Sequence, residues 1–295
     1  MGIVLLLASV FNDKIRINYY HSYRQIFKFN KLKNNKKKVL MFHAASAGEY
    51  EQIKPILRGI DRTNFFIVQS FTSPSIYNVQ ENSTLYDIKC YHPFDIFWLS
   101  YLFFKIISPE KYIITRHDIW PGHILMANYF NIPIYYINAN IHKNSLWYKK
   151  SLRFFVRYFF KKINYFIVPS NDIEENLKLI LPYHHYPKIK VIQDTRFNQI
   201  SYIKDKNQFV NKTKELHNIH ITFGSIDELD EKIIFEVLPT LIKDGYLIFL
   251  VPHEVDIKNI SRLEKELAKA SLPYNKYSDH WKEEKNIDYS KEKLF

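Results

Sequence analysis

The chain has 295 residues, of which 46% are hydrophobic and 17% aromatic, so it is long and apolar enough to bury a substantial core and to form two domains. Its one cysteine, Cys90, excludes an intramolecular disulfide framework and a multi-cysteine metal site, and favours a reducing compartment. The formal net charge of +12 fits an anionic partner such as nucleic acid, a lipid phosphate or an acidic membrane face, but solvated lysines are the favoured explanation for most of the chain.

The first segment, residues 1–38, begins with about eleven apolar residues and continues with aromatic and basic ones. A membrane-spanning helix needs about 20 apolar residues, and no basic region precedes this run, which argues against a cleaved signal peptide. The pattern indicates a helix that lies on a cytoplasmic lipid surface. An ordinary packed helix followed by a lysine-rich loop explains it as well, and both interpretations stay open.

Short apolar strands then alternate with helices. The predicted strands are 38–42, 65–70, 112–115, 134–138 and 165–169. The predicted helices are 49–59, 74–81, 121–130, 146–162 and 172–181. Strands separated by helices in this way predict βαβ units around a buried parallel sheet, so the fold class is α/β.

A second series follows, with predicted strands at 220–223 and 246–251 and predicted helices at 230–241 and 257–269. Gly224-Ser225 is predicted to form a turn. The stretch 201–217 is polar and rich in Lys and Asn, which is typical of a linker. We therefore predict one domain over residues 39–204 and another over 205–295.

The sequence HAASAGEYEQ, residues 43–52, follows the first strand of the first domain. In an open parallel sheet ligands bind beyond the carboxyl ends of the strands, so this turn faces the expected crevice. Small residues such as Ser46 and Gly48 let backbone approach a ligand, and Glu49 falls in the first turn of the next helix. Glu49 could accept a proton there, although a helix N-terminus tends to keep its pKa low. Simple helix capping by Ser46 and Glu49 is the alternative.

Several segments, in this order, resemble those of the 3-deoxy-D-manno-octulosonic acid (Kdo) transferases. Besides HAASAGEYEQ, they are Phe71-Thr72-Ser73-Pro74-Ser75, Tyr91-His92-Pro93-Phe94-Asp95, Arg116-His117-Asp118-Ile119-Trp120-Pro121, Ile137-Asn138-Ala139-Asn140, Asp194-Thr195-Arg196-Phe197, Gly224-Ser225 and Val251-Pro252-His253-Glu254-Val255. The residues 11–14 and the Pro-His-Glu-Val form look closest to members from Bacteroidetes-like bacteria.

This resemblance implies a GT-B fold of two Rossmann-like domains and an inverting transfer of Kdo from CMP-Kdo to a lipid A precursor (lipid IVA) in lipopolysaccharide core biosynthesis. The domain 39–204 would take the acceptor and the domain 205–295 the nucleotide. It also implies a peripheral enzyme on the cytoplasmic side of the inner membrane, with no metal, no cofactor and no nucleic-acid partner.

Residue roles follow from the matching motifs. Glu49 falls on the family's general base. Arg196 falls on a basic position of the family, where the cation would offset negative charge on the donor. Alternatively, Arg196 only forms a surface salt bridge. Arg116 stands where many relatives carry an acid, so this chain departs from the pattern there, and a cation could still bind the donor carboxylate. We take these three as the catalytic candidates.

The substrate-binding candidates share the same motifs. They are Ser46, Gly48, Asp118, Ser225, Pro252 and His253. Asp118 keeps an acidic position of the family and could orient substrate or cap the following helix. His253 replaces an Arg that contacts CMP, so contact with base or ribose is as plausible as contact with phosphate. Ser225 could bind phosphate or cap a helix.

Full-length relatives continue beyond the end of this sequence and carry a Gly-Gly-x-His-Asn-x-x-Glu segment there. We therefore expect the second domain to be incomplete. Either a separate C-terminal polypeptide supplies the missing part, or the chain is a decaying copy with little activity. Two other functions remain open. They are a non-catalytic GT-B remnant that binds lipid, and a GT-B transferase that uses a different sugar nucleotide.

Overall fold

The computed structural model describes residues 29, 32, 34–79, 83–116, 118–181, 188–206, 220–276 and 294. The predicted membrane-associating segment 1–38 lies almost entirely outside the described residues, and so do His117 and most of the predicted linker. The chain divides into two compact units, residues 1–204 (unit 1) and 205–295 (unit 2), and each is described by itself.

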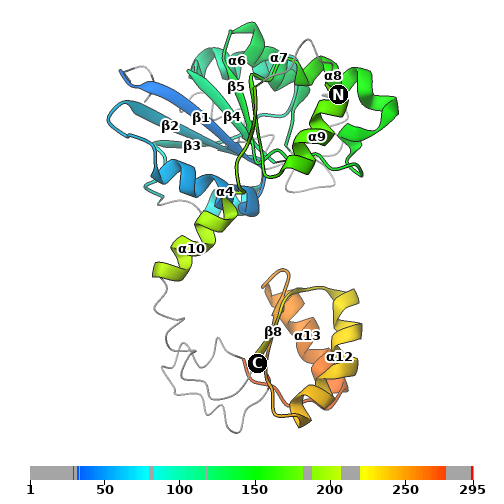
Figure 1. The fold of residues 1–295 in the computed structure, drawn as a ribbon. Helices are drawn as coiled ribbons and strands as arrows, with labels where there is room; N and C mark the ends of the chain where they lie inside the picture. The colour runs from blue at the N-terminus through cyan, green and yellow to red at the C-terminus, as the bar shows by residue number, and fades with distance from the viewer. Residues whose placement is uncertain are drawn as a thin grey trace. The chain divides into compact units, whose positions relative to one another are not determined.

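Unit 1 is built on a seven-stranded parallel sheet with the order β3-β2-β1-β4-β5-β6-β7 (Figure 1). The strands are β1 (Lys38–Ala44), β2 (Phe65–Phe71), β3 (Ile88–Tyr91), β4 (Lys111–Thr115), β5 (Ile134–Ile137), β6 (Tyr165–Val168) and β7 (Lys188–Val191). Every neighbouring pair of these strands is parallel. The predicted α/β class is confirmed.

Helices connect the strands and cover the sheet. They are α4 (Ala47–Arg58), α5 (Pro74–Val79), α6 (Phe97–Ile107), α7 (Pro121–Tyr129), α8 (Arg153–Phe160) and α9 (Asn171–Ile180), with 3₁₀ turns η2 (Leu146–Tyr148) and η3 (Lys150–Leu152) before α8. Helix α10 (Arg196–Lys206) follows β7, contacts α4 through Arg58 and Gln199, and continues past residue 204, where unit 1 ends. Successive strand residues point to opposite faces, so Met41 joins one buried cluster while Leu40 and Phe42 join the other. Ile53 and Leu57 place α4 on the second face.

The structure corrects three sequence-based assignments in unit 1. Strands β3 and β7 and helix α6 were not predicted. The predicted helix 146–162 is interrupted, because Lys149 has an extended backbone (φ −61°, ψ 131°), and only α8 is α-helical. Residues 201–206 of the predicted linker instead continue α10.

Unit 2, in the part that the structure describes, pairs β8 (His220–Ile226) with β9 (Leu247–Pro252) in parallel. Helices α12 (Glu228–Lys243) and α13 (Ile257–Lys269) pack on this pair through a small core that includes Leu238 and Ile248. The predicted Gly224-Ser225 turn is wrong, since both residues lie within β8. Ser225 has a φ of 63° and interrupts the ladder there.

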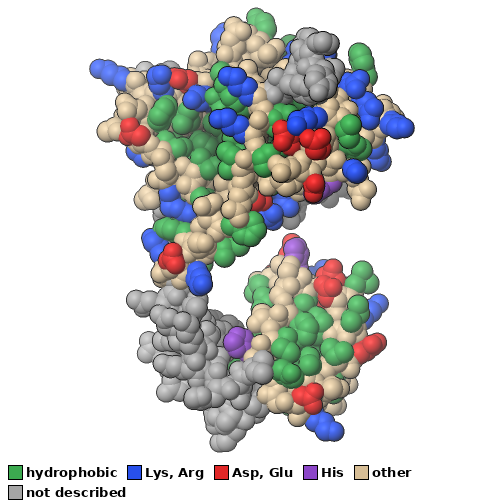
Figure 2. All heavy atoms as spheres, in the orientation of Figure 1, with side chains coloured by type: hydrophobic (Ala, Val, Ile, Leu, Met, Phe, Trp, Pro, Cys, Tyr) green, Lys and Arg blue, Asp and Glu red, His purple; other side chains and the backbone are tan. Residues whose placement is uncertain are grey.

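The surface of unit 2 carries exposed hydrophobic residues on α12, namely Leu229, Ile233 and Val237. These residues are four positions apart and so share one face of the helix. Figure 2 shows hydrophobic side chains gathered on this unit, and lysine and arginine side chains spread over the visible face of unit 1.

Candidate active site

The strand order fixes where a ligand can approach unit 1. The connections from β1 run through β2 to β3 on one side, and the chain then returns to place β4 on the other side of β1. Such a reversal between neighbouring strands opens a crevice at their carboxyl ends. Glu49 follows β1, and Arg116 and Asp118 follow β4. The topology therefore brings these three predicted residues to one edge of the sheet.

Glu49 is held in place by the turn that precedes α4. Its Oε2 accepts a hydrogen bond from the Ala45 backbone N–H at 2.7 Å, and the residue is 6% exposed. Ser46 is the N-cap of α4, and its Oγ accepts from the Glu49 backbone N–H at 3.4 Å. The capping interpretation thus holds for Ser46. Within the described ranges, no Lys, Arg or His side chain forms an ion pair with the Glu49 carboxylate.

The pKa of Glu49 is raised, which differs from the low value expected at a helix N-terminus. Burial is the largest cause, and the charge of Asp118 adds to it. The Ala45 hydrogen bond and the charges of His43 and Arg116 act in the opposite direction without reversing the shift. Because burial within unit 1 suffices, no closure of a crevice is needed to raise this pKa.

Asp118 forms a close pair with a histidine from β1. Its Oδ2 lies 2.5 Å from His43 Nε2, which donates because the ionised carboxylate can only accept. The Thr72 hydroxyl donates to the same oxygen at 3.1 Å. Burial alone would raise the pKa of Asp118, but the hydrogen bond and charge of His43, with the Thr72 bond, outweigh it and lower that pKa. Asp118 therefore stays ionised, and Glu49, whose pKa is raised, is the more basic of the two carboxylates.

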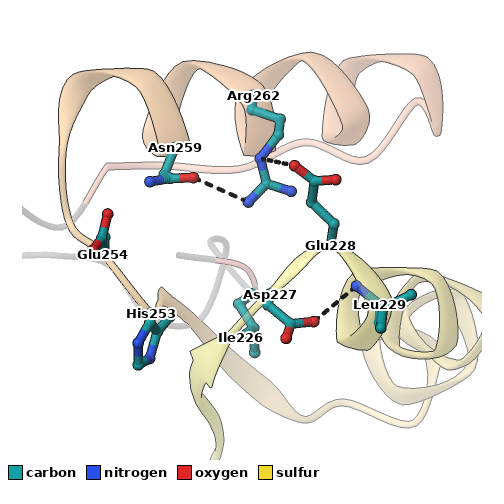
Figure 3. Close-up of a pocket in the computed structure, with 8 residues that line it drawn as sticks. All are labelled: Ile226, Asp227, Glu228, Leu229, His253, Glu254, Asn259 and Arg262. Atoms are coloured by element: carbon teal, nitrogen blue, oxygen red, sulfur yellow. Dashed lines mark hydrogen bonds and ion pairs between the residues drawn. The ribbon is translucent and has the colours of Figure 1, made fainter. Parts of the chain in front are cut away.

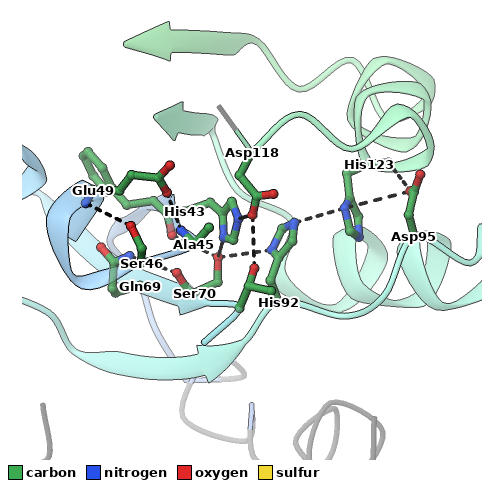
Figure 4. Close-up of polar contacts among 12 residues, drawn as sticks. His43, Ala45, Ser46, Glu49, Gln69, Ser70, His92, Asp95, Asp118 and His123 are labelled. Atoms are coloured by element: carbon green, nitrogen blue, oxygen red, sulfur yellow. Dashed lines mark hydrogen bonds and ion pairs between the residues drawn. The ribbon is translucent and has the colours of Figure 1, made fainter. Parts of the chain in front are cut away.

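A chain of buried polar side chains continues behind this pair (Figure 4). His43 Nδ1 contacts Ser70 Oγ at 3.0 Å, Ser70 Oγ contacts His92 Nδ1 at 3.2 Å, and His92 Nε2 contacts His123 Nδ1 at 3.0 Å. All three histidines are at most 1% exposed. Burial is the main reason that the pKa of His92 lies well below its usual value and that of His123 falls to about 3. Both rings are therefore neutral.

Asp95 anchors the far end of this chain to α7. Its two carboxylate oxygens accept from the backbone N–H groups of Gly122 and His123, at 3.0 and 3.1 Å. A β-carbon on Gly122 would collide with this carboxylate, so glycine is required for the contact. Asp95 thus satisfies the free N–H groups that begin α7, whereas Asp118 is left to pair with His43.

Arg116 lies in a strained backbone conformation at the end of β4. Its φ is 59°, a region that non-glycine residues rarely adopt. The backbone is fixed there by a bond from its N–H to the Ile137 carbonyl at 3.1 Å and by the Tyr136 hydroxyl, which donates to the Arg116 carbonyl. Its charge acts on Glu49 and lowers the pKa of that carboxyl. Such a fixed and strained conformation is often found at functional sites.

Arg196 begins α10 and pairs with Asp194. The guanidinium contacts Asp194 Oδ2 through Nε at 2.9 Å and through a terminal nitrogen at 2.8 Å. Gln52 of α4 donates weakly to both Asp194 oxygens at 3.4 Å, and the Thr195 hydroxyl donates to the Gln52 carbonyl at 2.6 Å. The salt-bridge alternative is therefore present in the structure. The guanidinium is still half exposed, at 49%, so it has room to meet a ligand.

Unit 2 carries the remaining predicted residues around a surface pocket at the ends of β8 and β9 (Figure 3). Ser225 Oγ lies 2.6 Å from His253 Nδ1, and Pro252 is buried in β9. The pocket is lined by Ile226, Asp227, Glu228, Leu229, His253, Glu254, Asn259 and Arg262. Its one arginine, Arg262, is paired with Glu228 and Glu231. Asp227 and Asp256 cap the N-termini of α12 and α13.

The structure thus groups the candidates by unit. Ser46, Gly48, Glu49, Arg116 and Asp118 share one edge of the unit 1 sheet, and Arg196 is tied to α4 of the same unit. Ser225, Pro252 and His253 belong to unit 2. The roles of His43, Ser70, His92 and His123 were not predicted. His43 and His92 stood within the quoted motifs, but nothing in their spacing shows that the fold stacks them with ring centroids 3.7 Å apart.

Comparison with known structures supports the fold. UDP-N-acetylglucosamine 2-epimerase from Rickettsia bellii is similar, with a TM-score of 0.54 and 13% identity over 81% of this chain and 69% of that one. The Neisseria meningitidis UDP-GlcNAc 2-epimerase, solved with UDP-GlcNAc bound, has a TM-score of 0.55 and 15% identity over 80% and 70%. At these identities the likeness shows a shared GT-B-type fold alone. No curated protein matches the chain in sequence.

The sequence profile of a glycosyltransferase family, described as 3-deoxy-D-manno-octulosonic-acid transferase (kdotransferase), matches residues 21–199. That range covers more than half of the chain and contains Glu49, Arg116, Asp118 and Arg196. The chain therefore belongs to the Kdo transferase family of glycosyltransferases.

Proposed function

We propose that this protein transfers Kdo from CMP-Kdo to a lipid A precursor (lipid IVA) with inversion at the anomeric carbon. The observation that carries the proposal is Glu49, a buried carboxylate without an ion-pair partner among the described residues, whose raised pKa suits a general base. It lies at the crevice edge of the sheet beside Asp118, whose pKa is lowered. Two neighbouring carboxyls with opposite shifts are typical of a divided acid–base role.

The proposed chemistry is a single displacement. Glu49 takes the proton from an acceptor hydroxyl, whose oxygen forms a bond to the anomeric carbon of Kdo. The bond from that carbon to the phosphate oxygen breaks, and CMP leaves with the electron pair. A general base of this kind contributes about 10²- to 10⁴-fold in rate.

The two arginines suit the charges of the donor. CMP-Kdo carries a phosphate and a sugar carboxylate, and guanidinium groups bind both types of anion well. Arg116, held at a fixed backbone conformation near Glu49, suits the sugar carboxylate. Arg196, half exposed and oriented by Asp194, suits the phosphate as charge develops on it.

The nucleotide would bind unit 2 through Ser225, Pro252 and His253. The carboxylates of Asp227, Glu228 and Glu254 line the same pocket, and the two nearby helix N-termini are already capped by aspartates. These negative charges disfavour a phosphate contact there. They favour contact of His253 and Ser225 with the cytosine or ribose.

We also propose that the protein works as a peripheral enzyme on the cytoplasmic side of the inner membrane, where such an acceptor resides. Within the described part of the chain, no helix has the length and apolar character required to span a bilayer. An amphiphilic, phosphorylated acceptor fits the positive net charge of the chain.

The test is a transfer assay with detergent-dispersed lipid IVA and either CMP-Kdo or UDP-GlcNAc as donor, read by mass spectrometry of the lipid. We expect one or more Kdo units to be added from CMP-Kdo and no sugar from UDP-GlcNAc. Transfer from UDP-GlcNAc alone would show a different sugar-nucleotide specificity. Binding of lipid IVA without any transfer would show a lipid-binding protein.

A further inference from the structure

Helix α8 exposes an aromatic face that the proposed chemistry does not use. Phe154 is 87% exposed, Phe155 46% and Tyr158 50%, while Val156 and Phe160 on the opposite face are buried. Positions 154, 155 and 158 share one side of a helix. Exposed phenylalanines side by side are uncommon on a soluble surface and mark a contact with an apolar phase or a partner.

Basic residues flank this aromatic face at both ends. Lys149 and Lys150 precede α8, and Lys161 and Lys162 follow it. The Lys162 ammonium lies 4.9 Å from the centroid of the Tyr158 ring, which shows that cation and aromatic ring share one side of the helix. We call these four lysines, with Phe154, Phe155 and Tyr158, the α8 surface.

Acidic residues are absent from a long part of the sequence around the α8 surface. No Asp or Glu occurs from residue 119 to residue 171. Helix α9 lies beside α8 (Figure 1) and is joined to it by the bond from Arg157 Nε to the Ile180 carbonyl at 2.6 Å. It carries three acidic residues, Asp172, Glu174 and Glu175. Two of them, Glu174 and Glu175, are paired with Lys178. The α8 surface is therefore positive as well as apolar.

These two properties together select the partner. A second copy of this chain would bring the same positive charges face to face, which opposes pairing of two α8 surfaces. A bilayer that contains anionic lipids offers negative headgroups to the lysines and an apolar layer to the phenylalanines, and aromatic rings favour that interfacial depth. We propose that the α8 surface docks on an anionic membrane, with Phe154 and Phe155 inserted below the headgroups.

This inference deepens the proposed function, because it names the surface that would bring unit 1 to a membrane-borne acceptor. It concerns described residues and is separate from the segment 1–38. The two segments can be told apart by substitution in the full-length chain.

The experiment is co-flotation of the full-length protein with vesicles of phosphatidylcholine, alone or with about 30% phosphatidylglycerol, a content high enough to give a negative surface potential. The variants are Phe154→Ser/Phe155→Ser and Lys149→Glu/Lys150→Glu. The matched controls are Ile233→Ser and Lys258→Glu, which remove an exposed apolar side chain and an exposed cation of unit 2. Because all these side chains are exposed, we expect every variant to fold, which circular dichroism checks.

We expect the parent to bind the anionic vesicles, and the double Phe variant to bind them at least about ten-fold more weakly. The double Lys→Glu variant should bind at least about 25-fold more weakly, since each cation contributes about 1 kcal/mol. Added salt should shrink this second difference. The controls should bind like the parent. Parent-like binding of both α8 variants would overturn the proposal and leave another segment as the anchor. A change of oligomeric state in the Phe variant, seen by sedimentation, would overturn it in favour of self-association.

Transfer to detergent-dispersed lipid IVA keeps the two proposals distinguishable. If the α8 surface is a membrane dock, the Phe variant transfers normally to the dispersed acceptor and loses transfer to acceptor in vesicles. Failure of the parent protein with dispersed acceptor would instead count against the proposed function, whatever the vesicle binding shows.

Discussion

His43 Nε2 and Asp118 Oδ2 lie 2.5 Å apart and join the carboxyl end of β1 to the loop after β4. This pair bridges β1 and β4, the two neighbouring strands at which the strand order reverses. It keeps the pKa of Asp118 low, while Asp118 in turn raises the pKa of Glu49. The ionised Asp118 is thus a positioning residue whose charge makes Glu49 a better base.

The pH dependence of transfer should report this coupling. Because the pKa of Glu49 is raised, kcat/KM should fall as the pH drops through a value above the usual 4.5 of a glutamate. Asp118→Asn removes a charge that raises this pKa, so the acid limb should move to lower pH. Arg116→Ala removes a charge that lowers it, so the limb should move to higher pH. Shifts of the same sign in both variants would contradict this electrostatic arrangement.

Gly48 offers a test of whether substrate occupies the space beside α4. No described atom lies within 4 Å of the position that a β-carbon would take there. Gly48→Ala should therefore stabilise the helix, by up to about 1 kcal/mol. If substrate approaches this backbone, the same variant should raise KM for the acceptor or donor several-fold. Greater stability with unchanged KM would show that the space is not used.

The buried histidines should make the protein sensitive to acid. In the unfolded chain His92 and His123 protonate near pH 6.5, whereas burial keeps both neutral in the fold. Below pH 6.5 the unfolded state then binds more protons, and the free energy of unfolding should fall by up to about 1.4 kcal/mol per pH unit for each histidine.

Urea unfolding between pH 7.5 and 5.5 would measure this slope by tryptophan fluorescence in a Trp281→Phe background, so that the signal comes from Trp98, Trp120 and Trp147 of unit 1. The background should also carry Glu49→Gln, since the raised pKa of Glu49 contributes in the opposite direction. His123→Gln should lose about half of the slope. An equal slope in both proteins would show that His123 titrates freely in the fold.

Arg196 should matter for the donor and also for stability. Asp194 is only 9% exposed, so Arg196→Ala leaves a nearly buried carboxylate without its cation and should cost more than the about 0–1 kcal/mol of an exposed pair. Urea unfolding measures this loss, and activity is compared under conditions where the variant stays folded. Loss of a cation that stabilises the leaving phosphate should lower kcat/KM by about 10²-fold, with Arg196→Lys intermediate. The matched control is Arg62→Ala, which breaks the ion pair with Asp87 on another part of unit 1. Equal activity of Arg196→Ala and the control would leave Arg196 a structural residue.

The sequence predicts the sheet well where the pattern is local. The apolar runs of β1, β4 and β5 and the turn chemistry around Ser46 were visible without coordinates. The Lys188–Val191 strand was missed, because it is a short edge strand with alternating lysines. The α6 helix was missed because its almost uniformly apolar sequence has no clear helical period.

The site could be predicted in part, because some of its residues follow a predicted strand directly in the sequence. Glu49 comes soon after β1, so the topology of a parallel sheet is enough to place it at the carboxyl end of that strand. The contacts of His43 reach Ser70 and Asp118, which are 27 and 75 residues away, and only the assembled sheet brings them together. The rise in the pKa of Glu49 was likewise missed, since burial by distant segments outweighs the local effect of the helix N-terminus.

Single-turnover transfer of Kdo from saturating CMP-Kdo, compared between the parent protein and Glu49→Gln, tests the proposed base most directly. The amide keeps an oxygen to accept the Ala45 N–H bond but cannot take a proton. Glu51→Gln on the same helix is the control, because Glu51 pairs with Lys54 and Gln199 away from this turn. We predict a rate at least about 10²-fold lower for Glu49→Gln, with the control close to the parent. A Glu49→Gln rate within about three-fold of the parent would contradict the role of Glu49 as the general base.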